Sequence, residues 1–408
     1  NPIDIIFNCY LAWIIYASDD HIDTAKKVFD LAAFYWCTAL ALNSTERMQS
    51  YLRLWLISLV AISVFAVCAV FGLELVSGTL ARTAEFKGRL ALMTWLHNNP
   101  NSLGHGAVAA IPIGYAFLWR SGTSFKRFMF IIVSAVAGYC VYNTQSKGGY
   151  LAGGGTLLDT MIFGRNWRVQ LVILAIGLTA GLSAIKLLPR METLDRNEGG
   201  IAGRLIIWQM ARSSMENEPY GVGMKKYRAL VISEMSGGRK VTESRDTHGS
   251  YVAIGAELGY GGLLFFVGII YAGFRALFQA RCGGDLQLER IRWTLFAILC
   301  SYMISAWIIN KEYHTDYFLV AGAISAFHRL ISRRQDESLP ENIKPQYELA
   351  NMGGFAPHLA MQTAGGSATA MPAWLLAIAE SGRLGAVKSS PSPTETIIDP
   401  ATQVQMNW

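Results

Sequence analysis

The stretch that decides the fold runs over residues 245–274 and reads RDTHGS followed by YVAIGAELGYGGLLFFVGIIYAGF. Its first six residues are polar and include a histidine, and the remainder is an almost unbroken apolar run. Such a run is close to the ~20 residues that cross a bilayer as a helix. The spacing of His248, Gly255, Gly259 and Gly262 predicts that they share one helical face. The sequence therefore places a titratable side chain at a membrane surface, at the head of a helix suited to close packing.

The composition extends this interpretation to the whole chain. Hydrophobic residues make up 52% of the 408 residues, charged residues make up 16%, and the mean hydropathy is +0.29. Soluble proteins carry about 25% charged residues, so these values indicate a membrane protein. The apolar runs are continuous rather than alternating, which favours helices over the strands of a β-barrel.

Ten apolar runs predict an all-α, polytopic transmembrane helical bundle. The run that includes Asp159 also holds several glycines and therefore suits the inside of the bundle better than a lipid-facing position. The chain opens on Asn1-Pro2, directly before an apolar run, and we expect a further N-terminal piece to precede it. The ten predicted spans are 3–17, 28–42, 51–75, 103–119, 128–142, 148–163, 169–188, 251–274, 293–309 and 316–331.

Lysine and arginine residues in the short loops predict the orientation of the bundle. If the ten spans are right, most of these cations fall in alternate loops on one side, which the positive-inside rule assigns to the cytoplasm. Lys26 and Lys27 fall on the opposite side. The cytoplasmic set is Arg47, Arg53, Arg120, Lys126, Arg127, Arg165, Arg168, Arg275, Arg281, Arg290, Arg292, Arg333 and Arg334.

The same alternation divides the chain into regions. One large loop, residues 189–250, lies on the non-cytoplasmic side and ends at the histidine of the opening stretch. Within it, residues 203–210 have helical periodicity. We assign residues 1–334 to one transmembrane domain. Residues 335–408 are rich in Pro, Ser, Thr, Gly and Ala, and we expect a largely disordered cytoplasmic tail there.

Cations also gather on the predicted non-cytoplasmic side, which opposes the usual bias. A single cation there could simply snorkel to lipid headgroups, but the group as a whole favours an anion-binding role. Lys147 stands out because it lies where two spans meet, beside small residues. This distribution explains the net charge of +6 without nucleic acid. The group is Arg82, Lys87, Arg89, Lys147, Lys186, Arg190, Arg204, Arg245 and His248.

His248 has two interpretations that its position leaves open. An imidazole titrates near ~6.5, so a neutral one could accept a proton from a hydroxyl at ambient pH. It could equally be an ordinary hydrogen-bonded loop residue. Two other segments are open in the same way: residues 19–23 could bind a divalent cation or form a solvated loop, and residues 313–316 could line the same cavity as His248.

Familiar cofactor and metal motifs are missing from the sequence. The six cysteines form no CxxC pair, which argues against a disulfide framework and a zinc site. There is no P-loop, dinucleotide-binding fingerprint, HExxH or GxSxG motif. We therefore predict neither a cofactor nor a catalytic metal.

Several short motifs together resemble the bacterial O-antigen ligase and O-antigen polymerase superfamily. Residues 248–251 and 257–262 are similar to its His-Asn-x-Tyr … Glu-x-Gly-x-x-Gly motif. Residues 203–223 contain Gly-Arg, then Trp, then Pro-x-Gly-x-Gly, as the family's loop does. Residues 99–101 resemble its Asn-Pro-Asn, and residues 146–149 resemble its Ser-Arg-Gly-Ala. The resemblance covers roughly residues 80–330.

Two departures from the family pattern bear on the chemistry. Lys147 stands where the family has arginine, which keeps the charge but loses bidentate phosphate geometry. Gly249 stands where asparagine is common, which puts any amide contact at that position in doubt.

The resemblance implies a polytopic inner-membrane glycosyltransferase of about twelve helical spans. Such an enzyme moves a glycan from a polyprenyl-diphosphate carrier to an acceptor at the periplasmic membrane face. His248 would then serve as the base for the acceptor hydroxyl, and Arg204 as the main diphosphate contact. The supporting diphosphate contacts would be Arg82, Arg89, Lys147 and Arg245.

Three alternatives to a ligase that acts on lipid A core or a related acceptor remain. Two belong to the same superfamily: a polysaccharide polymerase and a protein O-oligosaccharyltransferase. The third is a non-catalytic transporter or flippase for an anionic lipid, which would use the same cations without needing His248. Transporters commonly carry inverted repeats, and none is evident in this sequence.

Overall fold

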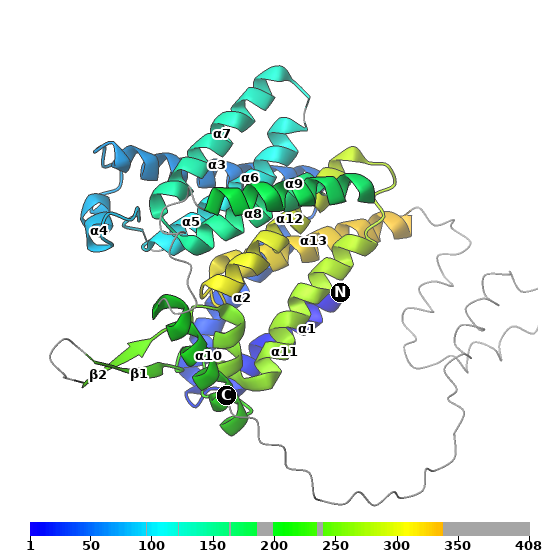
Figure 1. The fold of residues 1–408 in the computed structure, drawn as a ribbon. Helices are drawn as coiled ribbons and strands as arrows, with labels where there is room; N and C mark the ends of the chain where they lie inside the picture. Colours follow the sequence, from blue (N-terminus) through cyan, green and yellow to red (C-terminus); the bar gives the residue numbers. More distant parts are fainter. Residues whose placement is uncertain (95, 121, 163–164, 186–198, 235–239, 338–408) are drawn as a thin grey trace, which may run out of the picture. The chain divides into compact units, whose positions relative to one another are not determined.

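The fold was analysed in a computed structural model, in which residues 1–337 are described except 95, 121, 163–164, 186–198 and 235–239 (Figure 1). These residues are helical apart from one β-hairpin, so the predicted all-α class is confirmed. The hairpin lies in the predicted large loop and was not expected from the sequence. From residue 338 onward, the predicted tail lies outside the described residues.

Each of the ten predicted spans corresponds to a helix or to a continuous series of short helices (Figure 1). In chain order these are α1 (Pro2–Tyr16), α2 (His21–Ala41), α3 (Thr45–Val70), α5 (Pro100–Val108) with α6 (Ala110–Gly114) and η1 (Tyr115–Trp119), α7 (Ser124–Thr144), α8 (Lys147–Ile162), α9 (Trp167–Ile185), α11 (Ser250–Gln279), α12 (Leu286–Ile308) and α13 (Thr315–Glu337).

Five of these helical segments are long and apolar enough to cross a membrane: Thr45–Val70, Pro100–Trp119, Ser124–Thr144, Ser250–Gln279 and Leu286–Ile308. Two shorter apolar helices, Pro2–Tyr16 and Trp167–Thr179, accompany them within the described part of the chain. The protein is therefore a multi-pass helical membrane protein. The number of ten spans remains a prediction.

The remaining elements lie in two loops. A short helix, α4 (Thr79–Glu85), follows α3. The predicted large loop contains α10 (Gly199–Asn217), which confirms the helix expected at 203–210. It also contains β1 (Ala229–Glu234) and β2 (Lys240–Arg245), which pair antiparallel with Ala229 opposite Arg245 (Figure 1).

Polar capping residues explain where several helices begin. Asp20 accepts a hydrogen bond from Asp23 N at the start of α2, and Asn99 accepts one from Ser102 N at the start of α5. These side chains satisfy backbone N–H groups that have no partner within the helix. Pro100 follows its cap directly, at the first helical position, where its missing N–H costs nothing.

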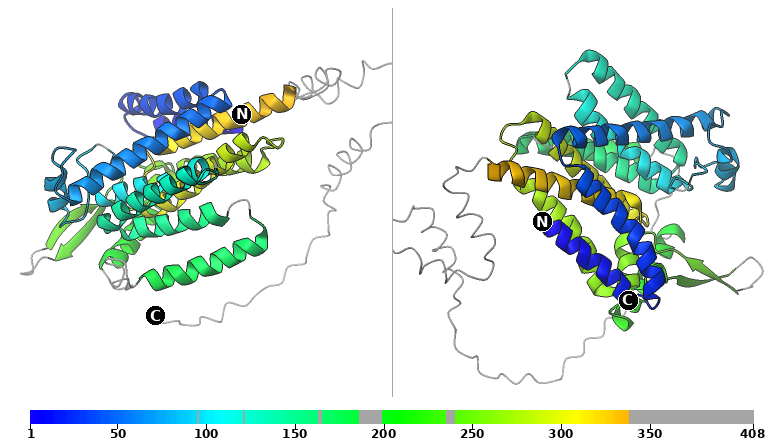
Figure 2. Two further views of the ribbon diagram at one scale, coloured as in Figure 1. Left: turned by 90° about the horizontal axis from the view of Figure 1, so that it is seen from above. Right: turned by 180° about the vertical axis from the view of Figure 1, so that it is seen from behind.

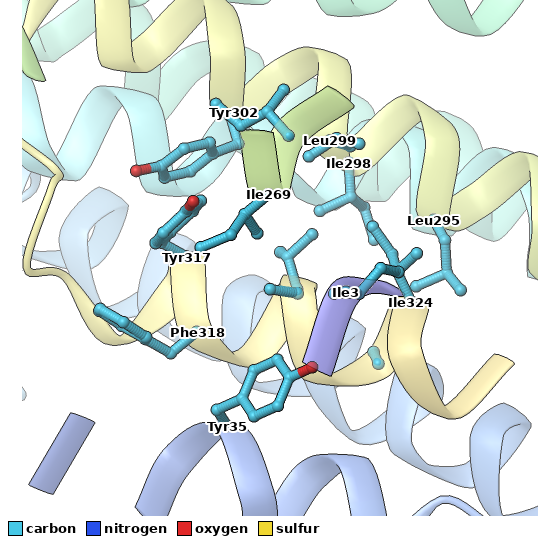
Figure 3. Close-up of a cluster of buried hydrophobic side chains, with 14 of the residues drawn as sticks. Ile3, Tyr35, Ile269, Leu295, Ile298, Leu299, Tyr302, Tyr317, Phe318 and Ile324 are labelled. Atoms are coloured by element: carbon cyan, nitrogen blue, oxygen red, sulfur yellow. The ribbon is translucent and has the colours of Figure 1, made fainter. Parts of the chain in front are cut away.

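The largest buried cluster joins the first and the last of the described helices. α1 packs along α11 and α2 packs along α13, as both views of Figure 2 show. Phe7 stacks on Tyr35 with ring centroids 3.7 Å apart, and Tyr317 stacks on Tyr302 at 5.1 Å. Figure 3 shows these tyrosines among Ile269, Leu299 and other aliphatic side chains. This core fixes the start of α11 and the loop between α12 and α13 relative to each other.

The predicted glycine stripe on α11 is wrong in two places. His248 lies outside the helix, because α11 begins at Ser250. Gly259 interrupts the helix with φ 65° and ψ −165°, a conformation open only to glycine. A Cβ at Gly259 would collide with the carbonyl of Pro219, so the kink allows the 219–223 loop to reach the helix backbone.

Loops that the sequence assigned to one side of the membrane also meet one another. Arg290 donates to the Arg120 carbonyl at 3.2 Å, and Arg334 bridges to Asp285 at 2.8 Å. At the opposite end of these helices, Lys226 pairs with Asp19 at 2.9 Å. The alternation of loops that the sequence predicted is consistent with these contacts.

Candidate functional site

His248 lies in the turn between β2 and α11, and its side chain is exposed. Its backbone has φ 51°, in the left-handed region that residues with a Cβ seldom adopt. The residues around it are buried: Thr247 is 3% exposed and Ser250 is 0% exposed. The fold thus presents the imidazole outward from a turn whose flanks are anchored in the protein.

The loop between α12 and α13 supplies those anchors. The Asn310 side-chain oxygen accepts hydrogen bonds from Gly249 N at 2.8 Å and from Thr247 Oγ1 at 3.1 Å. Ser250 Oγ donates to the Ile309 carbonyl at 3.0 Å and accepts from Lys311 N at 2.7 Å. The turn at His248 is therefore joined to this loop by four hydrogen bonds.

Helix α10 covers the same turn from another direction. Trp208 Nε1 donates to the Thr247 carbonyl at 3.0 Å, and its ring meets Trp307 edge-on with centroids 5.9 Å apart. Arg204 lies one helical turn before Trp208 and therefore on the same face of α10. Partial burial lowers the pKa of Arg204, but a guanidinium remains charged at any physiological pH. The arrangement places a permanent cation near the His248 turn.

The Pro-x-Gly-x-Gly segment, residues 219–223, packs on the backbone of α11. Tyr260 N donates to the Pro219 carbonyl at 3.1 Å, and Gly223 N donates to the Glu257 carbonyl at 2.8 Å. Gly221 has no room for a Cβ, because one would collide with the Glu257 backbone. The two segments that resemble motifs of the family, residues 219–223 and 257–262, are thus in direct contact.

Glu257 receives its own partners inside this contact. It is 7% exposed and accepts hydrogen bonds from Lys225 N and from the Tyr313 hydroxyl, each at 2.8 Å. These partners show that Glu257 holds the loop after residue 223 and the loop before α13 on α11.

A second group of motif residues centres on Asn101. Its Oδ1 accepts from Arg89 Nη2 at 3.0 Å and from Ser146 Oγ at 2.8 Å. Arg89 also donates to the Thr144 carbonyl at 3.1 Å. The Asn-Pro-Asn and Ser-Lys-Gly-Gly segments are therefore brought together, with Arg89 and Lys147 beside them.

The last turn of α12 connects the two groups. A Cβ at Gly249 would lie 3.2 Å from the Trp307 carbonyl oxygen, and one at Gly148 would collide with Ile308. Gly249, which follows His248, and Gly148, which follows Lys147, thus pack against consecutive residues of α12. The His248 turn and the Lys147 turn flank one helix end.

The other two predicted diphosphate contacts are less well placed. Arg82 donates to the Asn98 carbonyl at 2.7 Å, pairs with Glu85 at 2.6 Å and stacks over Phe86. Its guanidinium is therefore already engaged within α4 and with the next loop. Arg245 lies in β2, and its side chain is outside the described residues.

Behind the Asn310 loop lies a cavity of about 180 Å³, lined by residues of α3, α5, α12 and α13. Its polar wall holds Lys311, which pairs with Asp316 at 3.3 Å, and the buried imidazoles of His97 and His105. Burial lowers the pKa of His97 to about 4, so this imidazole is neutral at physiological pH. Burial also raises the pKa of Glu312, in the same loop, to about 8.

The acidic segment at residues 19–23 is occupied by structural contacts. Asp19 pairs with Lys226, Asp20 caps α2, and Asp23 pairs with Lys27. In the described part of the chain, no group of three or more His, Cys, Asp or Glu side chains is placed to hold a metal ion. These contacts favour the solvated-loop interpretation of residues 19–23.

These features define a helical membrane protein whose polar site lies on loops at one end of the bundle. Residues 128–267, about a third of the chain, match the family model described as O-Antigen ligase. This match confirms the resemblance to the O-antigen ligase superfamily that the motifs predicted. This supports a glycosyltransferase-like enzyme of the O-antigen ligase and polymerase type. No curated protein matches the chain significantly.

Sequence reasoning missed the residues that hold the site together. Asn310 and Lys311 were not singled out, and residues 313–316 were only a minor alternative. A polar run between two spans was the available signal, since such a run is costly near a membrane unless it has partners. His97 and His105 carried no distinguishing pattern.

Proposed function

We propose that this protein is a glycosyltransferase that moves a glycan from a polyprenyl-diphosphate carrier to an acceptor hydroxyl at the periplasmic face of the inner membrane. The observation that carries the proposal is that two loop segments pack against the C-terminal end of helix α12. One turn presents His248, and the other presents Lys147 beside Arg89. A proton acceptor and an anion-binding group from distant parts of the sequence thus flank one helix end.

The reaction needs both groups. The acceptor oxygen attacks the anomeric carbon and forms the new glycosidic bond, while the bond from that carbon to the diphosphate oxygen breaks. The diphosphate leaves with the electron pair, and the acceptor proton passes to His248. Neutral imidazole is suited to take this proton, and an exposed position gives the acceptor access to it.

Fixed cations would stabilise the negative charge that develops on the leaving diphosphate. Arg204, Arg89 and Lys147 are the best placed of the predicted contacts, because their elements adjoin the two turns. Such preorganised charges are worth more in a dry site than in water. Arg245 stays in the proposal as a residue of the same loop, and Arg82 is the weakest member.

The acceptor distinguishes three forms of this proposal: a ligase that acts on lipid A core or a related lipid, a polysaccharide polymerase, and a protein O-oligosaccharyltransferase. We favour the ligase. Analysis of surface glycans in a deletion strain separates them. Loss of capped lipid indicates a ligase, glycans of one repeat indicate a polymerase, and loss of protein-linked glycan indicates a protein glycosyltransferase.

Substitution of His248 tests the chemistry. His248→Ala should abolish glycan transfer in complemented cells while membrane insertion and protein level stay normal, because the imidazole is exposed. Arg204→Ala should lower transfer by weakening carrier binding. Near-normal transfer by His248→Ala would remove the catalytic role and favour a non-catalytic transporter of anionic lipid.

A further inference from the structure

Asn310 makes the contacts that fix the backbone on both sides of His248. Its Oδ1 accepts from Gly249 N at 2.8 Å and from Thr247 Oγ1 at 3.1 Å, the residues directly after and before the histidine. We propose that Asn310 is a positioning residue for glycan transfer, which holds the His248 imidazole in the orientation that accepts the acceptor proton. This inference rests on the proposed function.

The identity of the contacting atom follows from its partner. A backbone N–H can only donate a hydrogen bond, so the Asn310 atom that faces Gly249 N must be the carboxamide oxygen. The same oxygen then serves Thr247, whose hydroxyl can donate. A single acceptor atom therefore ties the two residues together across His248.

The backbone of His248 explains why such a tie is needed. A φ of 51° is unfavourable for a residue with a Cβ, so the conformation persists only where the surrounding structure holds it. Gly249 also packs closely, because a Cβ there would lie 3.2 Å from the Trp307 carbonyl oxygen. Without the Asn310 contacts, the turn would relax and the imidazole would move.

Asn310 is itself held on both sides. The carbonyl of Ile309 accepts from Ser250 Oγ, and Lys311 N donates to the same hydroxyl. The Lys311 carbonyl accepts from the Tyr302 hydroxyl at 3.1 Å, and Tyr302 belongs to the tyrosine cluster of Figure 3. The positioning contact is thus built onto the rigid core of α12 rather than onto a loop that moves freely.

The test compares Asn310→Ala with Asn310→Asp in purified protein reconstituted in nanodiscs. The substrates are solubilised membranes of the deletion strain, which contain the unused lipid-linked glycan and the unmodified acceptor. Asn310→Ala should lower kcat by about 10–100-fold and change KM for the lipid-linked glycan by less than about 2-fold, since displacement of a catalytic group slows the bound complex. Asn310→Asp keeps an oxygen acceptor and should retain activity within about 3-fold of the wild type.

Two controls separate positioning from a general loss of structure. Ser325→Ala removes a buried hydroxyl that also joins two residues, since Ser325 accepts from Asn1 and donates to Asp4 far along α13. It should leave kcat unchanged. Thr247→Val removes only one of the two Asn310 contacts, so it should lower kcat by a few-fold. This variant still tests the proposal if Asn310→Ala fails to fold.

A double substitution distinguishes failure of this inference from failure of the proposed function. If Asn310 acts through His248, His248→Ala/Asn310→Ala should have the same residual rate as His248→Ala alone. An inactive His248→Ala together with a fully active Asn310→Ala would overturn the positioning role only. A rise in KM with unchanged kcat for both Asn310 variants would instead show that the amide contacts substrate. Normal activity of His248→Ala would overturn both proposals.

Discussion

Gly259→Ala tests whether the kink in α11 holds the 219–223 loop in place on this helix. Gly259 adopts φ 65° and ψ −165°, and a Cβ there would collide with the Pro219 carbonyl. A residue with a Cβ in such a conformation costs on the order of 1–3 kcal/mol. To relieve the collision, residues 219–223 must move away from α11, which breaks the bond from Tyr260 N and weakens the one from Gly223 N.

The two affected hydrogen bonds set the rest of the magnitude. Each contributes about 1 kcal/mol net, so the total loss in the free energy of unfolding is roughly 3–5 kcal/mol. For the transmembrane domain, residues 1–334, an unfolding entropy of about 2.1 cal/mol/K per residue means that a loss of 1 kcal/mol lowers Tm by about 1.4 °C. The midpoint of thermal unfolding in nanodiscs should therefore fall by roughly 4–7 °C.

Gly138→Ala is the matched control. Gly138 lies inside α7, and nothing within 4 Å would meet a Cβ at that position. The substitution should leave Tm unchanged or raise it, because alanine favours helix by up to ~1 kcal/mol over glycine. If Gly259→Ala left Tm and transfer activity at the level of Gly138→Ala, the kink would have no role in docking the loop.

Two further predictions concern the polar contacts on either side of α12. Asn101→Ala removes the oxygen that accepts hydrogen bonds from both Arg89 and Ser146. Transfer should therefore fall by about 10-fold or more, through a higher KM for the lipid-linked glycan. An unchanged KM would contradict this prediction. Burial raises the pKa of Glu312 to about 8 from the ordinary 4.5. Between these two pH values the folded state binds more protons than the unfolded state. The free energy of unfolding therefore falls as the pH rises from 4.5 to about 8. Burial lowers the pKa of His97 to about 4, which acts in the opposite sense only below pH 6.5. The slope of Tm between pH 6.5 and 8 should therefore flatten in Glu312→Gln, and an unchanged slope would assign the effect to another group.

The helical bundle could be predicted because a hydrophobic composition and long apolar runs indicate membrane-spanning helices. Each apolar run had to satisfy its backbone hydrogen bonds internally, which leaves helix as the outcome. The hairpin at 229–245 was missed because its strands are only six residues each and their sequences do not alternate between apolar and polar residues. The kink at Gly259 was missed because glycine spacing alone cannot distinguish a smooth packing face from a break in the helix.

The chemistry of the candidate site stays a prediction, and its assembly could not be predicted from the sequence. Lys147 was singled out because a cation beside a span is costly without a partner. The roles of His248 and Arg204 came from the resemblance to the family and stay predictions. Asn310 could not be identified in this way, since an uncharged amide in a short loop has many ordinary uses.

The contacts of Asn310 show where the missing information lies. They join residues about sixty positions apart, and no period or motif in the sequence relates the two segments. The pairing exists because α11, α12 and α13 share one core, which brings the end of α12 to the start of α11. The proposed chemistry is thus specified locally by residue type, whereas the orientation of the proposed catalytic group is specified by the packing of three helices. A substitution in that packing should therefore change kcat without touching a residue that meets the substrate.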